Sequence, residues 1–207
     1  DPAAGLEEGR QEEAHVSAAD DALALYEAAG CRCPEDAFAR GIDVHRFEES
    51  IDSVIAGLRA DPAAFEIEHS PEWDTATSEL IYVDLAPRPD RTMEFLGVRI
   101  PVLEIVLSRI AAYAWMVPLQ SVLEDFLEDG QPIWMGRHLG GEPPPPLIVG
   151  FQERAARLVS QSRFRLLRPI ELARPMQGYE KCPCSGCRGR EAILENLLFG
   201  TDTWRPR

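Results

Sequence analysis

The sequence predicts an α+β fold that is mostly helical, with a small antiparallel sheet of about three or four strands and a C-terminal zinc knuckle. Three observations predict it. Helical periodicity of apolar residues occurs on both sides of a short stretch of high β-propensity. Three cysteines lie within six residues near the C-terminus. The length of 207 residues and the hydrophobic content of 45% suit one domain with a sizeable core.

The N-terminal part is predicted to be a flexible acidic leader, residues 1–17, followed by two helices. The first helix covers residues 18–29 and ends at Gly30, which places Cys31 and Cys33 in its exit loop. The second begins after Asp43 as N-cap and ends at Asp61-Pro62. Its apolar residues share one helix face: Val44, Phe47, Ile51, Val54, Ile55 and Leu58.

The middle of the chain is predicted to form the sheet. Residues 65–69, 79–86 and 92–100 alternate or are rich in β-formers, and the connections between them suit hairpins. We therefore expect an antiparallel meander of about three strands, with one further short strand at residues 133–135.

The most apolar segment predicts a central buried helix. Residues 102–117 place apolar side chains around more than half of a helical circumference, and Pro118 would end the helix. A shorter amphipathic helix is expected at residues 119–128, followed by Gly130. Further helices are expected at residues 150–167 and 190–199.

The charge distribution divides the chain into an acidic body, residues 18–141, and a basic helical segment with the cysteine cluster, residues 142–207. Residues 150–190 carry a charge of +6 in a chain whose net charge is −14, which leaves −20 for the remainder. Such a division predicts either an internal electrostatic contact or two surfaces with different partners. We expect the two parts to pack as one domain.

The cysteine cluster predicts a structural zinc site. Cys184 and Cys187 have the spacing of a zinc knuckle, and Cys182 lies close enough to bind the same ion. Zinc prefers four ligands, so a fourth is needed from elsewhere in the chain. The first candidates for the fourth ligand are Cys31 and Cys33. The second candidates are the four histidines: His15, His45, His69 and His138. Free thiols and a disulfide are the alternatives.

The residues around this cluster resemble a known zinc-binding motif. Lys181-Cys-Pro-Cys-Ser-Gly is similar to the opening of the SEC-C motif, a small zinc-binding tail in which CPCGSG precedes a second ligand pair. This chain lacks the residue between Cys184 and Ser185, and Ile193-Leu194 stand near the position of the second pair. The resemblance covers six residues and implies zinc chemistry rather than a family.

Two further sites are weighed against simpler interpretations. Glu66, Glu68 and Asp84 on neighbouring strands would suit a magnesium ion in a nucleotidyltransferase-like enzyme, whereas a solvated strand face is the simpler alternative. Four arginines of the basic segment could contact nucleic acid, although packing of their helix against the acidic body is favoured. These arginines are Arg154, Arg157, Arg163 and Arg165.

Composition favours a non-enzymatic interaction or regulatory protein of the toxin-neutralising type, whose acidic surface binds a basic protein partner. The chain has no GxSxG, GxxxxGK[ST], GxGxxG or HExxH motif. An odd number of cysteines, five, indicates a reducing compartment, and we expect a cytoplasmic protein without a membrane span. A signal peptide removed before Asp1 stays an open alternative.

Overall fold

The sheet dominates the architecture. The computed structural model describes residues 17–31, 40–70, 77–89, 96–127, 132–139, 142–180 and 191–200. Within them, six strands form one sheet in the order β1-β2-β3-β4-β5, and β6 pairs with β4 beside β5. The strands are β1 (Glu66–Ser70), β2 (Ser78–Asp84), β3 (Arg99–Ser108), β4 (Tyr113–Phe126), β5 (Pro132–His138) and β6 (Arg165–Leu166).

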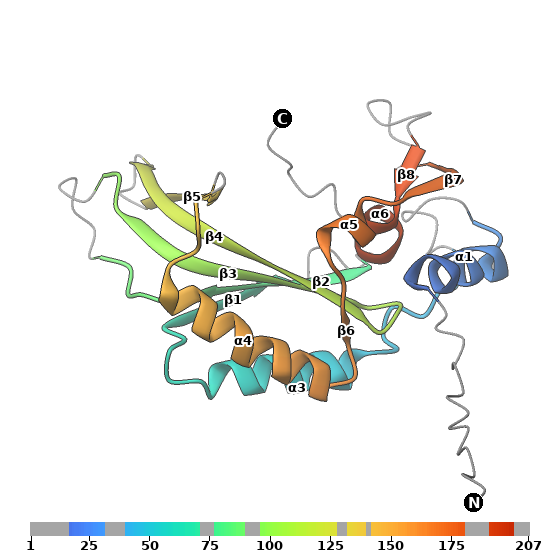
Figure 1. Cartoon of the computed structure of the whole chain (residues 1–207), viewed down its shortest axis with the longest axis horizontal. Coiled ribbons are helices and arrows are strands. Elements are labelled where there is room, and N and C mark those ends of the chain that lie inside the picture. The colour runs from blue at the N-terminus through green and yellow to red at the C-terminus, as the bar shows by residue number, and fades with distance from the viewer. Residues whose placement is uncertain are drawn as a thin grey trace, which may run out of the picture.

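Helices and a separate hairpin cover the sheet (Figure 1). The hairpin consists of β7 (Pro175–Glu180) and β8 (Glu191–Ile193), which form a two-stranded sheet of their own. The helices are α1 (Ala18–Ala29), α3 (Glu48–Arg59), α4 (Pro146–Gln161), α5 (Pro169–Leu172) and α6 (Leu194–Phe199).

The predicted fold class is wrong. The structure is mixed α/β with about 35% strand and 34% helix and a large six-stranded sheet, instead of a mostly helical fold with three or four strands. All main pairings from β1 to β5 are antiparallel, as the meander prediction had it, and only β6 runs parallel to β4. The predicted zinc knuckle lies outside the described residues.

The helices predicted at residues 102–117 and 119–128 are both wrong, because these residues form β3 and β4. The segment is apolar on both sides because the sheet is covered on both faces here, so its strands lack the usual alternation. Such a run fits a buried helix and a buried strand equally well. The β-branched Val102, Ile105 and Val106 suit the strand.

Pro118 lies inside β4, where it marks a change of neighbour instead of a helix end. Along β4, residues 113–114 pair with β6, and the pairing with β5 starts only at Leu119, opposite His138. Proline has no N–H to donate to a ladder, so it fits the gap between these two neighbours.

Several shorter predictions are confirmed. Helix α1 covers residues 18–29 and ends at Gly30 with φ 65°, and the strands expected at 65–69, 79–86 and 133–135 correspond to β1, β2 and β5. Other boundaries shift. The strand expected at 92–100 is wrong, because residues 96–98 are not strand and β3 begins only at Arg99. Helix α3 begins at Glu48, and α4 covers residues 146–161 instead of 150–167, a range that also contains β6. The helix expected at 190–199 divides into β8 and α6.

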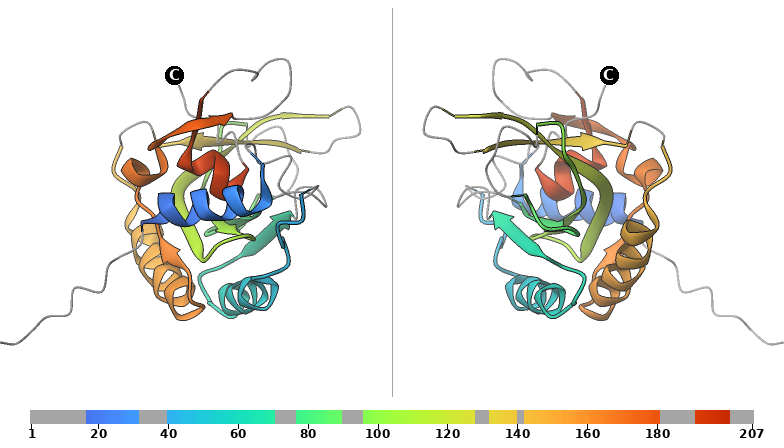
Figure 2. Two further views of the ribbon diagram at one scale, coloured as in Figure 1. Left: turned by 90° about the vertical axis from the view of Figure 1, so that its right-hand side faces the viewer. Right: turned by 90° about the vertical axis from the view of Figure 1, so that its left-hand side faces the viewer.

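One face of the sheet packs against α3 and α4 (Figure 2). The contact is made by the apolar stripes of the two helices: Ile51, Val54, Ile55 and Leu58 of α3, and Ile148, Phe151, Ala155 and Val159 of α4. The two helices approach each other closely at Gly57, where an added Cβ would lie 2.6 Å from Leu158 Cδ1.

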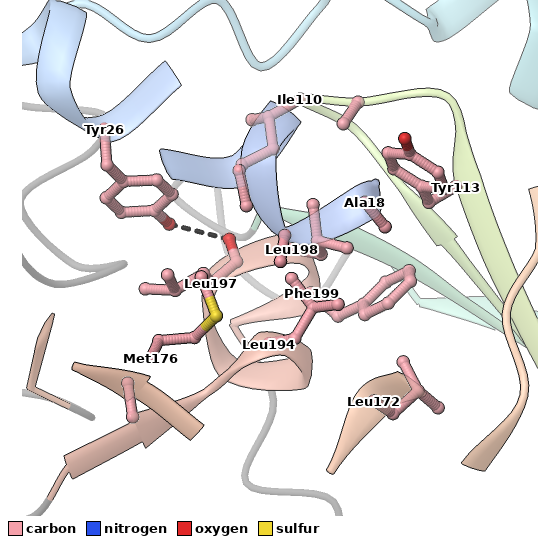
Figure 3. Packing of buried hydrophobic residues seen from close by; sticks show 14 of the residues in the cluster. Ala18, Tyr26, Ile110, Tyr113, Leu172, Met176, Leu194, Leu197, Leu198 and Phe199 are labelled. Carbon is pink, nitrogen blue, oxygen red and sulfur yellow. Dashed lines mark hydrogen bonds between the residues drawn. The ribbon is translucent and has the colours of Figure 1, made fainter. Parts of the chain in front are cut away.

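The opposite face carries a second core at the end of the sheet where β2 begins. Helix α1, helix α6 and the β7–β8 hairpin enclose it together with Val106 and Trp115 of the sheet and Ile110 of the turn between β3 and β4. Figure 3 shows part of this core. All six residues of α6 are buried. A smaller cluster around Ile100, Val102 and Leu119 occupies the other part of this face.

Candidate functional site

Cys31 is directed into the second core by the way α1 ends. Gly30 adopts a left-handed conformation, and the Gly30 and Cys31 amides donate to the carbonyls of Glu27 and Tyr26 at 3.1 Å each. This turn changes the direction of the chain after α1. As a result the Cys31 side chain is buried, at 4% exposure.

The thiol lies beside the strand that leads to the cysteine cluster. Cys31 lines a polar cavity of about 420 Å³ together with Tyr26, Glu27 and Gly30 of the α1 end, and with Gln177 and Tyr179 of β7. The rings of Tyr26 and Tyr179 meet edge to face at a centroid distance of 6.0 Å. The fold therefore brings the predicted N-terminal ligand to β7, only a few residues before Cys182 in sequence.

The cysteine cluster belongs to the connection between β7 and β8. Glu180 of β7 pairs with Glu191 of β8, so the ten residues between them join two adjacent strand ends. Cys182, Cys184 and Cys187 belong to this connection and, like Cys33, lie outside the described residues. Within the described ranges no group of three or more His, Cys, Asp or Glu side chains has the geometry of a metal site.

Three hydroxyl groups donate hydrogen bonds to the carboxyl end of α6. Tyr26 Oη donates to the carbonyl of Leu197 at 2.7 Å (Figure 3). Ser108 Oγ and Ser78 Oγ donate to the carbonyls of Leu198 and Phe199, both at 2.6 Å. Helix ends leave such carbonyls without intrahelical partners, so these bonds satisfy buried acceptors. The sequence alone gave no sign of them beyond two serines at strand ends.

The sheet acids share a face, as predicted, but an arginine lies among them. Arg88 Nε lies 2.5 Å from Asp84 Oδ2, and the guanidinium lies 3.6 Å from Glu68 and 3.8 Å from Glu66. Burial lowers the pKa of Arg88, but the hydrogen bond and the three negative charges outweigh it, so its pKa is raised. The site therefore already contains a cation. Arg88 also stacks over Trp134 at 5.4 Å.

A second charged cluster was missed by sequence reasoning. Glu79 is buried, and its carboxylate contacts Arg109 Nη2 at 3.3 Å and His69 Nδ1 at 3.2 Å. The three residues come from β1, from β2 and from the turn after β3. His69 lies at the surface at the end of its strand, as expected. A glutamate within an apolar strand was the available signal.

The arginines of the basic segment divide into two groups. Arg154 makes a two-pronged contact with Asp61, at 2.7 and 3.0 Å, and Arg165 contacts Glu171 at 2.8 Å. Arg157 and Arg163 are exposed. Because Asp61 belongs to the acidic body, the Arg154 contact is an internal electrostatic link of the kind that the charge division predicts.

Comparisons with known proteins give no identity. No family model, no curated protein and no solved structure matches the chain. None of the helices within the described ranges is both long and apolar enough to span a membrane. Function is therefore inferred below from residues, contacts and charges.

Proposed function

We propose that this protein is a non-enzymatic interaction protein, of the toxin-neutralising or regulatory type, whose acidic surface binds a basic protein partner. The observation that supports the proposal is the exposed acidic charge on α3. Arg88, Arg109 and Arg137 of the body form ion pairs with its own carboxylates, whereas Arg59 at the end of α3 forms none in the part of the chain that the structure describes. On the outer side of α3, Glu49 and Asp52 are exposed and form no ion pair within the described residues.

The acidic surface has a defined centre. Helix α3 buries its apolar stripe against the sheet and presents Glu48, Glu49 and Asp52 to solvent in its first turns. Exposed charges of one sign accelerate encounter with a partner of the opposite sign and disfavour acidic competitors. We therefore place the centre of the partner surface on the outer face of α3.

Charge reversal tests this assignment. Glu49→Lys/Asp52→Lys should abolish retention of a basic partner from the native cell, and raised salt should weaken retention by the wild type. The matched control is Glu142→Lys/Glu153→Lys, which makes the same change at exposed positions elsewhere. Loss in the α3 variant alone supports the proposal. Equal retention by both variants, or retention of an acidic partner, contradicts it.

We further propose that Cys31 completes a structural zinc site with Cys182, Cys184 and Cys187. The support is that Cys31 is buried and lines a pocket shared with β7, whose end leads into the cluster. Thiolates are the preferred ligands of structural zinc, which would tie the end of α1 to the hairpin.

Metal content tests the ligand assignment. We expect one zinc ion per chain by native mass spectrometry, lost in Cys31→Ser and retained in the matched control Cys33→Ser. Circular dichroism establishes that each variant folds. Metal-free wild type contradicts the site, and zinc retained in Cys31→Ser but lost in Cys33→Ser moves the fourth ligand to Cys33.

A further inference from the structure

The two outer strands of the sheet differ in how well they are protected against pairing. β1 is short, and the carboxylates of Glu66 and Glu68 on it are more than half exposed. Charged residues on a short edge strand oppose pairing with another chain. β5 has seven residues, Pro-Ile-Trp-Met-Gly-Arg-His, without a carboxylate. Within the described residues no strand pairs with its outer side.

The register shows which backbone groups of β5 face outward. The Leu123 amide donates to Val98 and its carbonyl accepts from Gly97, so the polar groups of Leu123 face β3. In an antiparallel ladder these directions alternate, so the groups of Val122 face β5 and its partner Met135. The N–H and C=O of Met135 therefore face inward, whereas those of Trp134 and Gly136 face away from the sheet.

The charge of β5 permits approach of a second copy. In a chain with a net charge of −14, most surfaces of two copies repel each other. On β5 the charge of Arg137 is balanced by Glu124 of β4, and the strand presents an exposed apolar side chain, Met135, at 47% exposure. Two copies that meet here bring no carboxylate of β5 opposite another.

We propose that two copies of the chain pair through β5 in antiparallel orientation, around a two-fold axis at Gly136. The two Gly136 residues then exchange both backbone hydrogen bonds, and the absence of side chains lets the strands meet closely. Met135 lies opposite Arg137 of the second copy, and Trp134 lies opposite His138. The contact is self-complementary, as a two-fold interface must be. The result is one continuous sheet across two copies.

Sedimentation and light scattering over a wide concentration range test the dimer. The wild type should show a concentration-dependent dimer, because pairing of one edge buries little surface and gives a weak complex. Gly136→Glu and Gly136→Lys each place two like charges opposite each other and should weaken dimerisation by about two- to fivefold. An equimolar mixture of the two variants should recover the dimer, because unlike charges then face each other.

The Gly136 substitutions should not disturb the fold of the monomer. A Cβ at Gly136 would meet only Leu119 Cδ1, at 3.9 Å, so the substitutions fit the monomer. Glu68→Lys on the opposite edge is the control and should leave the dimer unchanged. If a charged variant fails to fold, Gly136→Pro replaces it, since it removes the outward N–H.

Three results overturn the proposal: a wild type that stays monomeric at every concentration, a folded Gly136 variant that dimerises like the wild type, or a mixture that stays monomeric.

Discussion

The position of α6 depends on three residues whose buried hydroxyl groups bind its carbonyls. Tyr26, Ser78 and Ser108 come from three different elements and donate to three successive carbonyls of α6. The helix has only six residues, too few to be stable alone, so these bonds and its apolar contacts define its position.

Tyr26→Phe should lower the free energy of unfolding by about 1–2 kcal/mol, because the buried carbonyl of Leu197 loses its hydrogen-bond donor. Urea denaturation measures the change. Tyr113→Phe is the control: its hydroxyl donates to Asp21, which is partly exposed and can bind water instead, so a smaller loss is expected. Equal losses in the two variants would contradict the assignment.

For single residues, the sequence predicted the place of a residue in its helix, strand or loop better than its contacts with distant residues. Gly30 correctly indicated the end of α1, and with it the loop that begins at Cys31. The neighbours of Cys31 on β7 lie almost 150 residues later in the chain, and no local pattern specifies them. Likewise, Glu66, Glu68 and Asp84 share a face as the alternation required, but Arg88 among them belongs to a loop that has no periodicity.

Helices α3 and α4 pack closely because one of them has a glycine at the contact. Gly57 allows Leu158 to lie directly against the backbone of α3. Gly57→Ala should destabilise the protein by about 1 kcal/mol through this overlap, although alanine favours the helix. In a Leu158→Ala background the overlap is absent, so the same change should be stabilising.

A double-mutant cycle by urea denaturation measures the coupling between Gly57 and Leu158. Gly150→Ala in α4 is the control, since its Cβ would meet only Arg154 Nη1 at 3.9 Å, and it should stabilise the helix. An effect of Gly57→Ala that is the same in both backgrounds would exclude the proposed contact.

The link between α4 and the acidic body should depend on pH. The hydrogen bond from Arg154 is the largest cause that lowers the pKa of Asp61 in the folded protein. A lowered folded-state pKa adds stability above the unfolded pKa, and this contribution disappears as the pH falls through the folded pKa.

Asp61→Asn should therefore cost roughly 0.5–1 kcal/mol at neutral pH, discounted for the partial exposure of Arg154, and almost nothing in strong acid. Urea denaturation of both proteins across the acidic range measures the difference. Glu153→Gln, an exposed neighbour on α4, should show no such trend. A pH-independent cost of Asp61→Asn would show that the ion pair contributes nothing.

At the scale of elements, the prediction succeeded where a strand or helix has one buried face. Helix α1, helix α3 and strand β1 have a polar side, and their periods indicated their type. β2 is covered on both faces, and its β-formers indicated its type. The prediction failed for β3 and β4, where apolar residues cover both sides. The reason is tertiary: a second core lies on the far side of the sheet, and the sequence of β3 does not reveal it.

The whole molecule consists of two cores on opposite faces of one sheet. One core joins α3 and α4 to the sheet, and the other joins α1, α6 and the β7–β8 hairpin to it. Apart from residues of β3, β4 and the turn between them, the second core is assembled from elements near the two ends of the described chain. A metal that ties Cys31 to the hairpin would therefore stabilise mainly this core.

Removal of the proposed zinc ion should consequently loosen one half of the molecule more than the other. With a chelator present, amide hydrogen exchange should accelerate strongly in α1 and α6, whose residues share the core with Cys31, and little in α3 and α4. Cys31→Ser should reproduce this pattern without a chelator. Uniform acceleration would indicate that the two cores unfold together. An unchanged exchange pattern would show that no metal stabilises this fold.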